Sequence, residues 1–286
     1  MVALPIARSV AELRAGVAAW RQAGASIALV PTMGALHEGH LALVRRGLEL
    51  ADRVVASVFV NPTQFAPQED FDRYPRDEAG DAGKLASVGC GLLYAPTVGE
   101  MYPEGFCTAI TLGGPAEGLC GAFRPQMFGG VALVVTKLLL QAQPDFAIFG
   151  EKDYQQLQVI RRLTRDLDIP VRVVGVPTVR EADGLAMSSR NKYLTAEERA
   201  DASELYRTLS ETAAALAEGA PAGAILERAM AKLAAARFSK IDYLELRDAE
   251  TLLPLQRVSR PARLLVAAWL GAVRLIDNLP VEPVLG

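Results

Sequence analysis

Short apolar runs alternate with helical patterns over the first part of the chain, and this alternation constrains the fold more than any other feature. Runs typical of strands lie at residues 26–31, 54–60, 91–95, 145–150 and 171–177. Apolar residues at helical spacing separate them, at 39–51, 75–88, 130–142 and 153–167. Near-continuous apolar strands between helices are typical of a parallel sheet covered on both faces. The sequence therefore predicts an α/β fold with a doubly wound parallel sheet.

The pattern changes after about residue 180. Helical patterns at 195–218 and 222–237 are separated by the turn-rich stretch 219-GAPAGA-224. Three strand-like runs follow, at 241–248, 263–270 and 273–277. Helices followed by strands predict a smaller α+β domain. We therefore expect two domains, residues 1–178 and 179–286, with the link between them near 177–190.

Composition narrows the class of protein. The chain has 286 residues, a charged fraction of 22% and a net charge of −3, which disfavours nucleic acid as its main partner. Cys90, Cys107 and Cys120 are widely spaced and form no CxxC pair, so we expect neither a zinc site nor a disulfide framework. We find no signal-peptide pattern and no apolar run of about 18 residues. These features predict a reduced, cytoplasmic protein that does not bind membranes.

The two histidines of the chain lie together in 30-VPTMGALHEGHLALVRR-46. His37 and His40 follow a predicted strand and open a predicted helix, where open parallel sheets bind ligands. Gly34 and Gly39 permit close backbone approach, and the N–H groups near Gly39 can face an anion. Two imidazoles there could stabilise charge during attack on phosphorus. Taken alone, His37 could be a surface residue and His40 a packed one, but other segments supply matching parts.

The H-x-G-H spacing resembles a signature of the nucleotidyltransferase and class I aminoacyl-tRNA synthetase superfamily. Its second element is a flexible basic loop that closes over ATP phosphates, and 187-MSSRN-191 stands in that place. Ser188 and Ser189 offer hydroxyl groups, and Arg190 offers a planar cation. Without the histidines, the same stretch could be an ordinary entry to the helix near residue 195.

Two further segments carry polar residues at predicted strand ends. In 149-FGEKDYQQL-157, Lys152 lies between a strand and a helix, where its ammonium group could reach a phosphate. Gln155 and Gln156 follow in the first helical turn. In 59-FVNPTQF-65, Asn61 and Gln64 follow another strand, at the same edge of the sheet. Taken singly, these could be a surface lysine, a turn asparagine and an exposed glutamine.

Six strings together resemble the pantothenate synthetase (pantoate–β-alanine ligase) family, and they cover nearly the whole chain: PTMGALHEGH, FVNPTQF, EDFDRYPR, FGEKDYQQL, DGLAMSSRN and LVAAWLGAVRLIDN. The resemblance implies a Rossmann-like domain at 1–178 that binds ATP and pantoate. It also implies a smaller domain at 179–286 that closes over ATP, and a homodimer. The family condenses (R)-pantoate with β-alanine, using ATP and Mg²⁺. Pantoyl adenylate and pyrophosphate form first, and the β-alanine amine then displaces AMP to give pantothenate, a precursor of coenzyme A.

The resemblance also implies the role of each matching residue. His37, His40 and Lys152 would be catalytic, with His40 as the proton donor. Gln64 and Gln156 would bind pantoate, Gln64 would also bind β-alanine, and Asn61 would support that pocket. Mg²⁺ would be held mainly by ATP phosphates, so we expect no metal ligands from the protein. The implied ATP contacts are Met33, Gly34, Ala35, Leu36, His37, Glu38, Gly39, His40, Gly150, Glu151, Lys152, Asp153, Val179, Met187, Ser188, Ser189 and Arg190.

One stretch departs from the family pattern and keeps alternatives open. The family usually has R-P-G-H-F-x-G-V-x-T-V-V, whereas this chain has 124-RPQMFGGVALVV-135. Gln126 replaces a glycine, Met127 a histidine and Leu133 a threonine. One alternative is a non-catalytic binding protein on a retained scaffold. A second alternative, which does not depend on this stretch, is a cofactor adenylyltransferase: it would share ATP and the two histidines but would not consume β-alanine. The chain shows no evident anticodon-binding region, which disfavours a tRNA synthetase.

Overall fold

The computed structural model describes residues 4–66 and 71–283, which form two compact units. Unit 1 comprises Met1–Leu112, Arg124–Glu151 and Val159–Pro177. Unit 2 comprises Gly113–Phe123, Lys152–Gln158 and Thr178–Gly286. The two domains predicted at 1–178 and 179–286 remain a prediction. Their boundary assigns two short segments, Gly113–Phe123 and Lys152–Gln158, to the first domain, whereas both segments belong to unit 2. The two units are described separately below.

Unit 1 contains a parallel sheet of six strands in the order β1-β4-β3-β2-β5-β6. The strands are β1 (Ile6–Ala7), β2 (Ile27–Thr32), β3 (Arg53–Val58), β4 (Leu92–Tyr94), β5 (Phe146–Gly150) and β6 (Arg172–Val176). The predicted strands are confirmed. Strand β1 was not predicted, because its two residues are too few to show an apolar run.

The strand order reverses between β2 and β5, which pair through Ala28–Phe146 and Leu29–Ala147. From β2 the chain adds β3 and β4 on one side, and from β5 it adds β6 on the other. In open α/β sheets, ligands bind outside the carboxyl ends of the strands at such a point. Those ends are Thr32 of β2 and Gly150 of β5, so the topology favours a site beside the segments that follow them.

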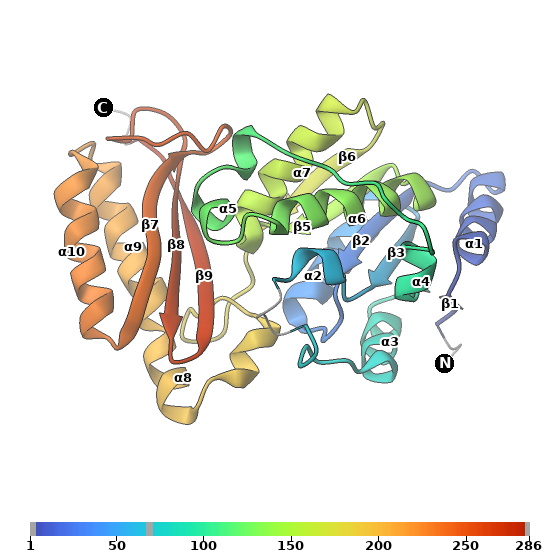
Figure 1. The fold of residues 1–286 in the computed structure, drawn as a ribbon, viewed down its shortest axis with the longest axis horizontal. Coiled ribbons are helices and arrows are strands. Elements are labelled where there is room, and N and C mark those ends of the chain that lie inside the picture. Colours follow the sequence, from blue (N-terminus) through green and yellow to red (C-terminus); the bar gives the residue numbers. More distant parts are fainter. Residues whose placement is uncertain (1–3, 67–70, 284–286) are drawn as a thin grey trace. The chain divides into compact units, whose positions relative to one another are not determined.

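Helices pack on both faces of this sheet (Figure 1). They are α1 (Val10–Gln22), α2 (Glu38–Leu50), α3 (Glu78–Ser87), α4 (Val98–Met101) and α6 (Met127–Ala142); α7 (Tyr154–Asp166) begins in unit 2 and ends in unit 1. Ala28 and Val30 of β2 share a buried cluster with Leu43 and Val44 of α2. That cluster contains no residue of α6, which contacts β2 and α1 instead. The predicted doubly wound α/β architecture is confirmed.

Unit 2 contains an antiparallel sheet of β7 (Phe238–Asp248), β8 (Ala262–Leu270) and β9 (Val273–Val281). Its helices are α5 (Leu119–Phe123), α8 (Ala196–Ala202), α9 (Glu204–Ala217) and α10 (Ala222–Ala235). Figure 1 shows α9 and α10 side by side along one face of the sheet. Val266 and Leu275 of the sheet pack there with Leu209 and Leu233 of the helices. The predicted α+β class is confirmed.

Two predicted elements of unit 2 differ in extent. The single helix predicted at 195–218 is wrong, because the chain forms α8 and α9, which meet at Ser203. Strand β9 extends to Val281, beyond the predicted run at 273–277. The prediction stopped where Asn278 and Pro280 interrupt the apolar pattern, but β9 is an edge strand, where proline needs no ladder partner for its nitrogen. Among the described residues, no helix is both long enough and apolar enough to cross a membrane.

Candidate active site

The loop after β2 is held by a buried carboxylate. Gly34 and Ala35 have left-handed φ angles of 85° and 51°. The Asp81 carboxylate, on α3, accepts hydrogen bonds of 2.8 Å from the backbone N–H groups of Ala35 and Leu36. Asp81 is 1% exposed, and Lys84 donates to the carbonyl of Leu36 at 2.9 Å. Sequence reasoning missed Asp81. Its signal was an acidic residue four positions before Leu85 on the buried face of α3.

His37 and His40 cap the helix that they open. The Nδ1 atom of His37 accepts from the N–H of Gly39 at 3.2 Å, and Nδ1 of His40 accepts from the N–H of His37 at 3.3 Å. The two rings lie 4.2 Å apart, centroid to centroid. A backbone N–H can only donate, so both Nδ1 atoms act as acceptors, and a neutral imidazole must then carry its proton on Nε2. Each ring therefore has its donor on the Nε2 side.

The same capping engages two main-chain N–H groups at the start of the helix. The N–H of Gly39 is engaged by His37, and the N–H of His40 donates to the carbonyl of His37 at 2.8 Å. The N–H groups of Gly39 and His40 are therefore occupied within the loop in this conformation, and the expectation that N–H groups at the start of this helix face an anion stays a prediction.

Asn61 and Gln64, predicted to lie at one sheet edge, are in direct contact within unit 1. Asn61 is 1% exposed, and its Nδ2 donates at 3.1 Å both to Oε1 of Gln64 and to the carbonyl of Gly130 on α6. A Cβ atom on Gly130 would lie 2.2 Å from the carbonyl oxygen of Thr63. Only glycine therefore lets α6 approach the short 3-10 helix η1 (Pro62–Gln64) this closely.

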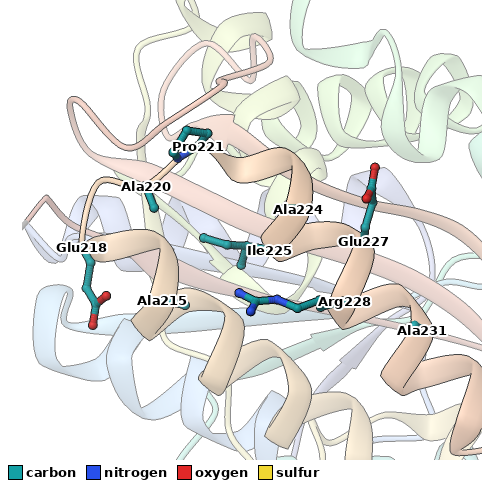
Figure 2. Close-up of a pocket in the computed structure, with 9 residues that line it drawn as sticks. All are labelled: Ala215, Glu218, Ala220, Pro221, Ala224, Ile225, Glu227, Arg228 and Ala231. Atoms are coloured by element: carbon teal, nitrogen blue, oxygen red, sulfur yellow. The ribbon is translucent and has the colours of Figure 1, made fainter.

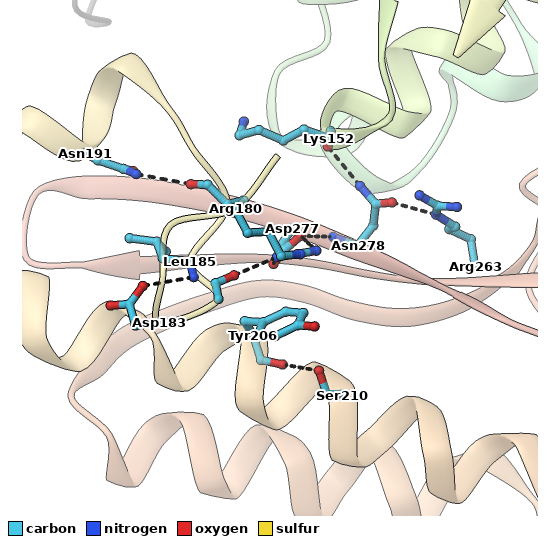
Figure 3. A network of polar contacts seen from close by, with 12 residues as sticks. Lys152, Arg180, Asp183, Leu185, Asn191, Tyr206, Ser210, Arg263, Asp277 and Asn278 are labelled. Atoms are coloured by element: carbon cyan, nitrogen blue, oxygen red, sulfur yellow. Dashed lines mark hydrogen bonds and ion pairs between the residues drawn. The ribbon is translucent and has the colours of Figure 1, made fainter. Parts of the chain in front are cut away.

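In unit 2, the backbone of Lys152 is anchored to strand β9. Lys152 lies in η3 (Glu151–Asp153), directly after β5, and its side chain is 21% exposed. Its Nζ atom lies 3.8 Å from the carboxylate of Asp153. Its carbonyl accepts from Nδ2 of Asn278 at 2.9 Å, and Arg263 donates to the other end of that amide at 2.6 Å (Figure 3). The lysine is therefore fixed at its main chain.

The segment 179–190 is anchored by the residue before Asn278. Arg180 pairs with Asp277 through two hydrogen bonds of 2.7 and 2.9 Å, and its guanidinium stacks on Tyr206 at 4.1 Å (Figure 3).

The segment also has hydrogen bonds of its own. Arg180 forms a β-bridge with Ala186, and the N–H of Met187 donates to the carbonyl of Val179. Ser188 then caps η4 (Ser189–Tyr193) by accepting from the N–H of Arg190. None of Arg180, Arg263, Asp277 or Asn278 was predicted from the sequence to be a functional residue.

The two adjacent glutamines of α7 differ in burial. Gln155 is 4% exposed, accepts from the N–H of Cys120 at 2.9 Å and donates to the carbonyl of Pro115 at 3.0 Å. It therefore fastens the segment 113–120 inside unit 2. Gln156, predicted to bind pantoate, is half-buried beside it.

The predicted site residues are divided between the units. Residues 33–40, Asn61, Gln64, Gly150 and Glu151 belong to unit 1. Lys152, Asp153, Gln156, Val179 and residues 187–190 belong to unit 2. A separate hollow of about 700 Å³ lies at the turn between α9 and α10 and contains no predicted site residue (Figure 2). Its lining residues are Ala215, Glu218, Ala220, Pro221, Ala224, Ile225, Glu227, Arg228 and Ala231.

Known proteins are similar to this chain over nearly its whole length. Residues 5–280 match the family described as Pantoate-beta-alanine ligase. The chain belongs to the pantoate–β-alanine ligase family. A pantothenate synthetase from Paramagnetospirillum magneticum is 63% identical to this ligase over 281 residues, which cover 98% of this chain and 99% of the relative.

Solved structures agree with this ligase assignment. A pantothenate synthetase from Thermus thermophilus has a TM-score of 0.91 at 49% identity, over 98% of this chain and 100% of that chain. The pantoate–β-alanine ligase from Francisella tularensis was solved in complex with beta-gamma ATP and β-alanine. Its TM-score is 0.81 at 33% identity, and 97% of each chain is covered.

The stretch in which this ligase departs from the family pattern forms the start of α6. Gln126 has φ −84° and ψ −17°, a conformation open to every residue, so the missing glycine causes no strain here. Arg124 donates to the sulfur of Met127 and, at 3.3 Å, to the carbonyl of Gln64. Met127 therefore contacts a residue that supports the Gln64 backbone. Leu133 is 8% exposed and packs as an ordinary core residue.

Proposed function

We propose that this ligase condenses (R)-pantoate with β-alanine through a pantoyl-adenylate intermediate, with ATP converted to AMP and pyrophosphate. The observation that carries the proposal is the His37–His40 pair. Both Nδ1 atoms are occupied by backbone donors, and the pair follows the strand at the switch point of the sheet. Two imidazoles with Nε2 donors suit the oxygens of a phosphate under attack.

The first step is attack of the pantoate carboxylate on the α-phosphorus of ATP, which releases pyrophosphate. His37 and His40 would donate from Nε2 to the phosphate oxygens as negative charge builds up there. His40 would be the proton donor, and the Lys152 ammonium group would balance the phosphate charge. In the second step the β-alanine amine attacks the activated carbonyl and AMP leaves. Neither step needs a covalent enzyme nucleophile, so catalysis would depend on positioning and electrostatics.

The acid and amine substrates would bind through carboxamides. Gln64 and Gln156 would hold pantoate, Gln64 would also contact β-alanine, and Asn61 would position Gln64 through their 3.1 Å hydrogen bond. Carboxamides suit both substrates because they donate and accept. The β-alanine in the Francisella tularensis structure supports this amine substrate.

ATP would be contacted by residues 33–40, 150–153, Val179 and 187–190, taken from both units. Mg²⁺ would enter with ATP and neutralise its phosphates. In the part of the chain that the structure describes, no three His, Cys, Asp or Glu side chains gather as a metal site. The proposal also includes a homodimer, a cytoplasmic location where ATP is supplied, and small-molecule partners only.

The test is release of AMP and pyrophosphate from ATP, with pantoate alone and then with pantoate and β-alanine. Sustained AMP formation only with both substrates is the expected result. ATP binding without AMP in either condition would support the non-catalytic alternative. Adenylyl transfer to a phosphorylated cofactor precursor, without use of β-alanine, would support the adenylyltransferase.

A further inference from the structure

Tyr102 begins a chain of hydrogen bonds that ends at Gln64. It directly follows α4, and its ring lies 5.2 Å from that of Phe106 and 6.1 Å from that of Phe59. Its hydroxyl donates to Oδ1 of Asn61 at 2.8 Å. Burial raises the pKa of Tyr102, so the phenol stays protonated and remains a donor at neutral pH.

The partners of Asn61 determine which way its amide faces. Its Oδ1 accepts from the Tyr102 hydroxyl, and from the N–H and hydroxyl of Thr63 at 3.3 and 3.0 Å. Its Nδ2 faces two acceptors, Oε1 of Gln64 and the carbonyl of Gly130. The oxygen and nitrogen of an amide have nearly the same shape, so such partners decide its orientation. A reversed Asn61 would set its oxygen against two other oxygens.

This orientation passes to Gln64. Because Asn61 holds Oε1 of Gln64, the amide nitrogen of Gln64 must face away from Asn61. That Nε2 lies 2.8 Å from the sulfur of Met33, the first residue of the loop that leads to His37. A thioether is a weak acceptor, whereas a carboxylate or hydroxyl oxygen is a strong one. An acid substrate would therefore replace a weak partner with a strong one.

We propose that Tyr102 is a positioning residue of this ligase: through Asn61, it makes Gln64 present its amide nitrogen to oxygen atoms of the acid substrate. The inference rests on the proposed function, since Gln64 is the residue proposed to bind pantoate. Tyr102 itself need not touch the substrate. The effect should therefore fall on pantoate and spare ATP.

The test compares Tyr102→Phe with Tyr94→Phe. Each variant loses one phenol oxygen, but the hydroxyl of Tyr94 bonds to the sulfur of Met101 at 3.8 Å and takes no part in the chain to Gln64. The Asn61 oxygen keeps both Thr63 donors in Tyr102→Phe, so the variant should fold. We expect kcat/KM for pantoate to fall about 3- to 10-fold, which corresponds to one hydrogen bond. The KM for ATP should stay within about twofold, and Tyr94→Phe should match the wild type.

A double-mutant cycle separates positioning from simple loss of structure. In a Gln64→Met background, where the amide is absent, Tyr102→Phe should no longer change kcat/KM for pantoate. An equal drop in both backgrounds would overturn the inference, as would a Tyr102→Phe enzyme indistinguishable from Tyr94→Phe. If instead the wild-type chain forms no AMP from pantoate and β-alanine, the proposed function fails and this inference fails with it.

Discussion

The side-chain amide of Asn278 donates to the backbone carbonyl of Lys152 across 2.9 Å. The preceding residue, Asp277, holds Arg180 in a two-bond ion pair. Lys152 and the segment 179–190 are far apart in the chain, and both are proposed to bind ATP. Two consecutive residues of β9 therefore hold both segments, and the anchoring of Lys152 can be tested directly.

Asn278→Asp should raise the KM for ATP. The new carboxylate can still accept from Arg263, but it sets an oxygen against the Lys152 carbonyl in place of a donor. A buried carbonyl that loses its partner costs about 1–3 kcal/mol, so we expect roughly a tenfold higher KM for ATP and little change for pantoate. Leu233→Val, on the buried face of α10, is the control, because it should lower the melting temperature without changing either KM. An unchanged KM for ATP in Asn278→Asp would refute the anchoring role.

Asp81→Asn should slow the first step of the reaction. The amide nitrogen cannot accept from the N–H of Ala35 or Leu36, so one of these donors loses its partner inside the protein. We expect a loss of about 1–3 kcal/mol in unfolding free energy and a lower kcat, because the loop leads directly to His37. The control is Asp77→Asn at the N-cap of the same helix, where asparagine caps equally well. Equal kcat values for the two variants would show that the loop does not depend on Asp81.

His40→Asn should separate the two nitrogen atoms of the imidazole. The asparagine oxygen can take the place of Nδ1 and accept from the N–H of His37, so the helix cap should survive. It offers nothing at the position of Nε2, and we expect turnover to fall about 10²- to 10³-fold with a nearly unchanged melting temperature. His40→Gln, which can place a nitrogen near Nε2, should retain more activity. Full turnover in His40→Asn would remove His40 from the catalytic assignment.

Asp248 should make the fold sensitive to acid. Burial alone would raise the pKa of Asp248, but hydrogen bonds from Thr251 and Arg260 outweigh it and lower the pKa from 3.8 to about 2. A pKa that is lower in the folded state stabilises the fold above about pH 4, and this contribution is lost as the pH falls towards 2. It amounts to at most about 2.5 kcal/mol, reduced by solvent screening.

Urea unfolding of Asp248→Asn at two pH values checks this. The variant should be less stable than the wild type at pH 7, and the difference should shrink towards pH 2.5. Glu49→Gln, at a side chain that is 61% exposed, should differ little from the wild type at either pH. A difference for Asp248→Asn that does not depend on pH would show that its carboxylate charge is not the cause.

The strands and layers could be predicted because their signal is local. The apolar run before Pro31 and the helical spacing after His40 each lie within one short window, and both elements are confirmed. The helix break at Ser203 left no such signal, because the helical pattern runs on across it. The end of β9 was missed for another reason. Pro280 resembles a strand breaker until the strand is known to lie at an edge.

The supporting residues of the site could not be predicted, because their partners are far away in the sequence. Asp81 is bonded to residues 45 and 46 positions earlier, and Tyr102 is bonded to Asn61, 41 positions earlier. A periodic pattern of apolar residues does not reveal contacts between residues that are so far apart in the sequence. The contact between Asn61 and Gln64 was foreseeable, since both follow one strand end three residues apart. The catalytic and binding roles of these residues remain predictions.

Asp277 and Asn278 point to opposite faces of the β7–β9 sheet. Asp277 lies opposite Val266 on the face covered by α9 and α10, and Asn278 lies opposite Leu265 on the other face. Successive side chains in a strand point to opposite faces of the sheet, so both anchors depend on the register of β9. An insertion or deletion of one residue at the Gly271 turn, if carried into β9, would exchange them and break both attachments at once. We therefore expect this hairpin to tolerate changes of sequence far better than changes of length.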